Sequence, residues 1–156
     1  MVDLNHTLWQ SCPWSNLRQL NDSTIVGYKL VKGWGPERHI YFAATFSRKL
    51  EHFYILQDGK PVIYNTKRFR SHKEAWGEKL MACFTFSTHT GEEVYVKTAI
   101  SGVSTEGALA NINELDGLTF ESVKSRAEEL WEKELGKYHV AGDLKTKRTF
   151  YTSAYH

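Results

Sequence analysis

The sequence predicts a mainly β chain, an antiparallel β-sandwich followed by helices at its C-terminal end. Short runs of β-branched and aromatic residues, separated by turn signals, recur between residues 24 and 100. From about residue 104 the apolar residues change to helical spacing. The 156 residues, 41% of them hydrophobic and 13% aromatic, are enough for about one domain with a buried core.

The stretch from Thr24 to Phe46 predicts two strands joined by a turn. Thr24–Val31 and His39–Phe46 are rich in residues that fit a pleated, half-buried surface. Lys32–Glu37 lies between them, and its two glycines and one proline cannot continue a strand ladder. Trp34 stands between the two glycines and has little local packing of its own. We expect it to lie on its own sheet, on a neighbouring domain or on a ligand, since binding residues concentrate on such loops.

Before this pair of strands the pattern is weaker, and after it a hairpin is predicted. Val2–Leu8 alternates weakly, which is compatible with a strand, and Ser11–Asp22 is polar and is predicted to be a loop. His52–Gln57 is a strong strand pattern, and Asp58-Gly59 favours a tight turn. Lys60–Asn65 is the expected partner strand, and its proline places it at a sheet edge.

The next segment has no clear period, but two further strands follow it. Thr66–Glu78 is charged, and no element is predicted there. Lys79–Ser87 alternates apolar and polar residues, and so does Glu92–Ile100 after a turn. Strands at this regular spacing are typical of a β-sandwich.

Three helices are predicted at the C-terminal end. The first has an N-cap at Ser104 or Thr105 and is ended by Asp116-Gly117, and the second begins after an N-cap at Thr119 and ends at Gly136. A third pattern places Phe150 to Tyr155 on a helix whose aromatic face has nothing to pack on within the chain. We therefore expect the natural polypeptide to continue beyond His156.

Composition excludes some partners and leaves the redox state open. The net charge of +2 and a pI near 8.5 are too mild to indicate nucleic-acid binding. No run of about 18 apolar residues predicts a membrane span. The N-terminus has neither the basic start nor the apolar core of a signal peptide. Cys12 and Cys83 allow either a disulfide or two free thiols, and we favour free thiols.

No complete catalytic or metal-binding set is recognisable. The seven histidines do not fall at zinc-ligand spacings, and there is no phosphate loop and no Gly-x-Ser-x-Gly elbow. The glutamates between Glu128 and Glu134 alternate with basic residues, which is typical of a solvated helix surface. The residues alone therefore predict no catalytic residue and no metal ligand here.

Several segments nevertheless resemble one known family. Gly27-Tyr28, Lys32–Arg38 (KGWGPER) and Ile40–Arg48 (IYFAATFSR) resemble the N-terminal sandwich domain of glycoside hydrolase family 92, the calcium-dependent exo-acting α-mannosidases. Val94–Leu109 resembles the family's last sandwich strand and first linker helix. Trp131–His156, which ends in FYTSAYH, resembles the entry into the family's (α/α)6 barrel.

The resemblance implies a division of the chain. Residues 1–101 would be part of a supersandwich-like N-terminal domain, residues 102–142 linker helices, and residues 143–156 the truncated start of the barrel. In this family the barrel supplies the catalytic carboxylates and the calcium ligands. A general acid protonates the leaving oxygen while a general base activates water, which inverts the anomeric centre. Those positions lie beyond His156, so the resemblance assigns no catalytic or metal residue here and implies that the sequence alone is inactive.

The resemblance also implies a substrate-binding role for two residues. Trp34 and Gly35 match a loop that reaches the rim of the family's active site, and a flat indole suits the apolar face of mannose. The implied partners are mannose-containing glycans and the missing helical barrel, in a periplasmic or secreted protein. Two alternatives stay open: a free-standing carbohydrate-binding β-sandwich module, or a structural interaction domain.

Overall fold

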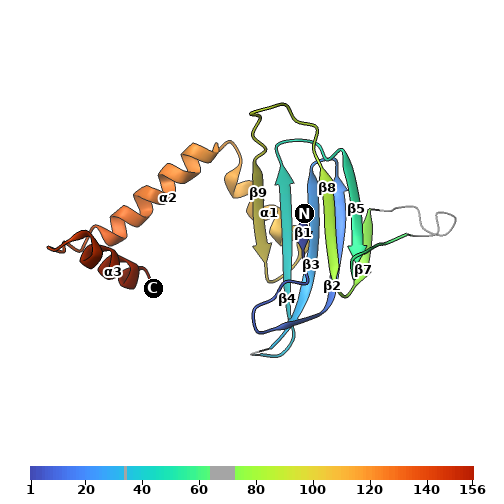
Figure 1. Cartoon of the computed structure of the whole chain (residues 1–156), viewed down its shortest axis with the longest axis horizontal. Helices are drawn as coiled ribbons and strands as arrows, with labels where there is room; N and C mark the ends of the chain where they lie inside the picture. The colour runs from blue at the N-terminus through green and yellow to red at the C-terminus, as the bar shows by residue number, and fades with distance from the viewer. Residues whose placement is uncertain (34, 64–72) are drawn as a thin grey trace. The chain divides into compact units, whose positions relative to one another are not determined.

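The structure is a computed structural model that describes residues 1–33, 35–63 and 73–156. It divides into two compact units, Met1–Asp116 and Gly117–His156. The first unit contains two antiparallel β-sheets and one α-helix (Figure 1). The second unit consists of two helices. The predicted β-sandwich followed by helices is confirmed.

The larger sheet has five strands in the order β7-β2-β3-β4-β9. In chain order they are β2 (Ser11–Asn21), β3 (Thr24–Lys32), β4 (Arg38–Phe46), β7 (Glu74–Gly77) and β9 (Val96–Ser101). The hairpin predicted between residues 24 and 46 is confirmed, because β3 and β4 pair from Thr24 opposite Thr45 to Val31 opposite Arg38.

The smaller sheet has four strands in the order β1-β8-β5-β6. They are β1 (Val2–Asp3), β5 (His52–Gln57), β6 (Lys60–Pro61) and β8 (Leu80–Thr85). Asp58 and Gly59 have φ angles of 51° and 76°, the left-handed pair that a tight primed hairpin turn requires. The predicted turn and the edge position of β6 are confirmed, whereas β1 is much shorter than the strand expected over residues 2–8.

The core lies between the two sheets. Alternate residues of each strand point into it, and its fully buried centre includes Leu17, Ile25, Leu80 and Ala82. A cluster of phenylalanine rings closes one region of this core, with ring centroids 5.0 to 5.6 Å apart: Phe46, Phe84 and Phe86. Cys12 and Cys83 are free thiols, as favoured from the sequence.

The prediction of a loop over residues 11–22 is wrong, because this segment forms β2. Three of its polar residues, Ser15, Asn16 and Gln19, are buried. Ser15 Oγ donates a 2.8 Å hydrogen bond to the Gly77 carbonyl, and Asn16 Nδ2 donates one of 3.2 Å to the Ala75 carbonyl. Buried polar groups are stable when they are paired in this way, so their polarity does not indicate exposure. The partner strand is β7, which the sequence also failed to predict.

Helix α1 (Thr105–Ile112) covers part of the outer face of the five-stranded sheet (Figure 1). Ser104 caps its start by accepting a hydrogen bond from the Gly107 amide at 3.0 Å, as predicted. The helix buries Ala108 and Ile112 against Val26, Ala43 and Ala99, and a short 3-10 turn, η1 (Asn113–Leu115), follows it. This small apolar layer attaches α1 to the sandwich.

The second unit contains α2 (Phe120–Leu135) and α3 (Leu144–Tyr155). Thr119 is the predicted N-cap of α2, and its side chain and that of Ser122 form a reciprocal capping box. Gly136 is the C-cap, as predicted, although its φ of −66° is helical rather than left-handed.

Helix α3 has partners that the sequence did not reveal. The rings of Tyr155 and Trp131 pack with centroids 4.6 Å apart. The Tyr151 hydroxyl donates a 2.7 Å hydrogen bond to the Tyr138 carbonyl. The expectation that the last aromatic face has nothing to pack on is therefore only partly right, since Tyr155 contacts α2 and still keeps 54% of its surface exposed.

The close approach of β2 and β4 to β3 leads to a stability prediction. A Cβ atom on Gly27 would lie 2.1 Å from the Asn16 carbonyl oxygen and 2.9 Å from Phe42 Cε1. Gly27→Ala must push apart paired strands, and we expect it to lower the free energy of unfolding by about 2–3 kcal/mol. Urea unfolding followed by tryptophan fluorescence measures this. Gly102→Ala is the matched control, because no heavy atom lies within 4 Å of its Cβ position. Equal stability of the two variants would contradict the packing described for β3.

The cap of α3 leads to a pH prediction. Asp143 accepts a 2.7 Å hydrogen bond from the Thr146 amide, and this bond lowers the pKa of the Asp143 carboxyl below its ordinary value. Since the pKa is lower in the folded state, the cap stabilises α3 above the unfolded pKa and is lost as pH falls through the folded pKa. Hydrogen exchange of the Thr146 amide, followed between about pH 6 and about pH 2, reports this loss. Asp143→Asn keeps a good cap without a titrating group. If the Thr146 amide loses its protection over the same pH range in the Asp143→Asn variant, a group other than Asp143 causes the loss.

Candidate functional site

The loop between β3 and β4 holds both of the substrate-binding residues suggested by the resemblance. Trp34 lies outside the described residues. Gly35 is half-buried, and a Cβ atom built on it would meet no heavy atom within 4 Å. Local packing therefore does not require a glycine at this position.

An ion pair joins the two ends of this loop. Lys32 Nζ lies 2.5 Å from Glu37 Oε1, and both side chains are about half exposed. The hydrogen bond and the charge of Lys32 lower the pKa of the Glu37 carboxyl below its ordinary value. Glu37 is thus a carboxylate at neutral pH, and it is paired with the loop's own lysine.

The segment between β1 and β2 lies along the same loop. A Cβ atom on Gly33 would sit 2.8 Å from Gln10 Cγ, so the loop backbone passes directly over this side chain. Nearby, Lys29 Nζ donates a 3.1 Å hydrogen bond to the His6 carbonyl. These contacts join two segments that are more than twenty residues apart in sequence.

A second tryptophan projects from this neighbouring segment. Trp9 has a φ of 59°, a left-handed conformation that is unusual for so bulky a residue, and 98% of its surface is exposed. The turn around it is closed by a hydrogen bond from Thr7 Oγ1 to the Gln10 carbonyl. The sequence did not single out Trp9, although its position beside Leu8 in a polar stretch was a usable signal.

Among the described residues, the carboxylates do not gather into a metal-binding group. The glutamates of α2 are exposed on its surface, as predicted. Within the three described ranges, no three His, Cys, Asp or Glu side chains gather so that they could hold a metal ion. The described residues therefore do not fit a calcium site. In the same ranges, no helix combines the length and the apolar character needed to cross a membrane.

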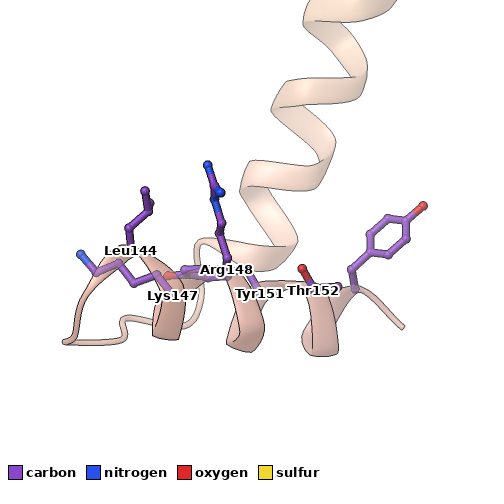
Figure 2. A pocket seen from close by; sticks show the side chains of 6 residues that line it. Leu144, Lys147, Arg148, Tyr151 and Thr152 are labelled. Atoms are coloured by element: carbon purple, nitrogen blue, oxygen red, sulfur yellow. The ribbon is translucent and has the colours of Figure 1, made fainter.

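Helix α3 carries a shallow depression (Figure 2). Its lining consists of Leu144, Lys147, Arg148, Tyr151, Thr152 and Tyr155. All six side chains come from this one helix, and none of them is a carboxylate. A substrate pocket needs polar groups that converge from several directions, and this surface has a single wall.

Comparison with family models identifies both halves of the chain. The model of the glycosyl hydrolase family 92 N-terminal domain matches residues 1–101, and the model of the family's catalytic domain matches residues 107–156. The chain belongs to glycosyl hydrolase family 92. The family resemblance stated from the sequence is confirmed.

Solved structures of the family give the same result. The chain is 70% identical to the family GH92 α-mannosidase BT3965 from Bacteroides thetaiotaomicron over 99% of its length, with a TM-score of 0.91. The same enzyme in complex with mannoimidazole matches with a TM-score of 0.90. The inverting family GH92 mannosidase BT2199 from Bacteroides thetaiotaomicron VPI-5482 is 20% identical over 93% of the chain with a TM-score of 0.77, a likeness of fold.

The chain spans about a fifth of these relatives, 21% of BT3965 and 19% of BT2199. A search of curated proteins found no match. Within the chain, the first family match ends with β9 at Ser101, and the second begins at residue 107, inside α1, which starts at Thr105. All three α-helices thus fall wholly or mainly within the catalytic-domain match, although α1 packs on the sandwich.

Proposed function

We propose that the complete protein to which this sequence belongs is an exo-acting, inverting, calcium-dependent α-mannosidase that removes terminal α-linked mannose from N-glycans or mannans. One observation carries the proposal: 70% identity over 99% of this chain to an α-mannosidase that has been crystallised with mannoimidazole. At that identity the scaffold around the substrate is expected to be shared as well as the fold.

In this proposal the present residues are the scaffold and the rim of the active site. Residues 102–142 serve as linker helices, and residues 143–156 begin the helical barrel. The catalytic carboxylates and the calcium ligands belong to the rest of the barrel. Calcium, a hard cation that prefers oxygen ligands, would there hold the mannose hydroxyls. The resemblance also supports a periplasmic or secreted location.

The proposed activity is tested on the complete protein. We expect it to release mannose from an α-mannobiose, with the β-anomer formed first in a proton NMR time course, because an inverting enzyme adds water on the opposite face. A calcium chelator should abolish the release, and added calcium should restore it. A β-mannobiose is the control substrate and should stay intact. Binding of mannose without release would favour a carbohydrate-binding module, and retention of the anomer would contradict the mechanism.

The rim role of Trp34 and Gly35 is tested in the same protein. Trp34→Ala should lower kcat/KM by about tenfold, the loss expected for one aromatic contact with a sugar face. Gly35→Ala should fold normally, because its Cβ position is open, and should reduce kcat/KM by narrowing the rim. Tyr54→Ala is the control, since this exposed tyrosine belongs to the other sheet. An unchanged kcat/KM in a normally folded Trp34→Ala variant would remove Trp34 from the rim.

A further inference from the structure

Five aromatic side chains lie on the outer face of the five-stranded sheet, the face that also carries α1. We name them the aromatic strip: Trp14, Tyr28, His39, Tyr41 and Trp76. Side chains alternate between the two faces of a strand. Tyr28 is therefore on the same face as Val26, and Tyr41 and His39 are on the same face as Ala43, both of which contact α1.

The strand register places these side chains in adjacent rows. Tyr28 lies directly opposite Tyr41, and their ring centroids are 5.4 Å apart. The His39 ring lies 5.7 Å from that of Tyr28 and 6.0 Å from that of Tyr41. On the other side of Tyr28 lies β2, where Asn16 is directly opposite Tyr28 of β3 and directly opposite Trp76 of β7. The five side chains thus stand on four neighbouring strands, β4, β3, β2 and β7, with Asn16 between Tyr28 and Trp76.

The two tryptophans at one end of the strip are only partly covered. Trp14 is 46% exposed and Trp76 is 53% exposed, and both stand on strands rather than on loops. Exposed aromatic side chains that gather on one face of a sheet mark an interaction site. Tryptophan and tyrosine are also the residues most enriched at the centre of protein interfaces.

The strip continues an interface that is already present. Helix α1 begins at Thr105, and the catalytic-domain match covers residues 107–156. Its Ala108 and Ile112 bury Val26 and Ala43, which belong to the N-terminal-domain match. The covered row and the strip are neighbours on one face, since Val26 and Tyr28 are two residues apart on β3.

We propose that the aromatic strip is a docking surface for the part of the catalytic domain outside this sequence, on the same sheet face that α1 already covers. About four-fifths of the BT3965 chain has no counterpart in this sequence, which leaves ample catalytic domain to cover the strip. A sugar is a poorer occupant, because the amide nitrogen of the central Asn16 is already bonded to the Ala75 carbonyl and to Glu74. A sugar site needs polar groups that are free to converge on hydroxyls.

Hydroxyl-radical footprinting of the complete protein tests this surface. Trp14 and Trp76 should be oxidised about fivefold more slowly than Tyr54, after correction for intrinsic reactivity, because interface cores exclude water. Tyr54 is the matched reference, since it is 48% exposed and stands on the other sheet. The protection should depend neither on protein concentration nor on added mannobiose.

Each other outcome overturns the proposal. If both tryptophans are oxidised at the rate of Tyr54, the strip is free. If their protection grows with protein concentration, a second copy of the protein covers the strip. If they are protected only in the presence of mannobiose, a sugar covers it. The double variant Trp14→Ala/Trp76→Ala gives a second readout. It should lower the unfolding temperature of the catalytic domain, whereas Tyr54→Ala should not, and an equal effect of both would also contradict the proposal.

The inference rests on the family assignment and not on the proposed activity. A complete protein with a protected strip but no release of mannose would contradict the proposed function alone. An active mannosidase with an unprotected strip would contradict the docking surface alone.

Discussion

Strand β3 must be apolar on both faces, because it separates the core of the sandwich from the layer beneath α1. Ile25 points into the core between the sheets, and the next residue, Val26, points outward under the helix; both are buried. A one-residue shift in the register of this strand would exchange the two sets of side chains. Gly27 adds a steric constraint, because only a residue without a side chain admits the Asn16 carbonyl and the Phe42 ring at their observed distances.

The way in which each strand is stabilised explains why the sequence predicted some strands well and others poorly. The apolar runs of β3, β4, β5 and β8 are stabilised by burial of the residues that define their pattern, so the pattern is visible locally. β2 is stabilised differently. Its buried Ser15 and Asn16 hydrogen-bond to the backbone of β7, about sixty residues away. A polar residue bonded by a distant strand has the same local signature as a polar residue in a loop, and only the fold distinguishes the two.

The candidate site shows the same limit. The glycines of the β3–β4 loop predicted the turn correctly, and the family motif selected Trp34 and Gly35. Nothing local to residues 5–10 indicated that this segment lies against the loop, because the contact of Gln10 with Gly33 depends on the pairing of whole strands. The exposed Trp9 follows from that placement. Helix caps were predictable for the opposite reason, since Thr119 and Ser122 act within a single turn.

The position of α1 shows that a domain boundary in sequence need not be a boundary in packing. Most of this helix is covered by the catalytic-domain match, yet its apolar residues pack on the outer face of the N-terminal sandwich. Removal of α1 would expose Val26 and Ala43. The exposed apolar surface of this sheet face would then include these two residues as well as the aromatic strip. A sandwich that depends on the first helix of its neighbour to cover part of one face is not an independent module in energetic terms. Burial of the apolar area that each domain leaves uncovered favours their association. On this face that area extends from the residues under α1 through Tyr28 and Tyr41 to the two tryptophans.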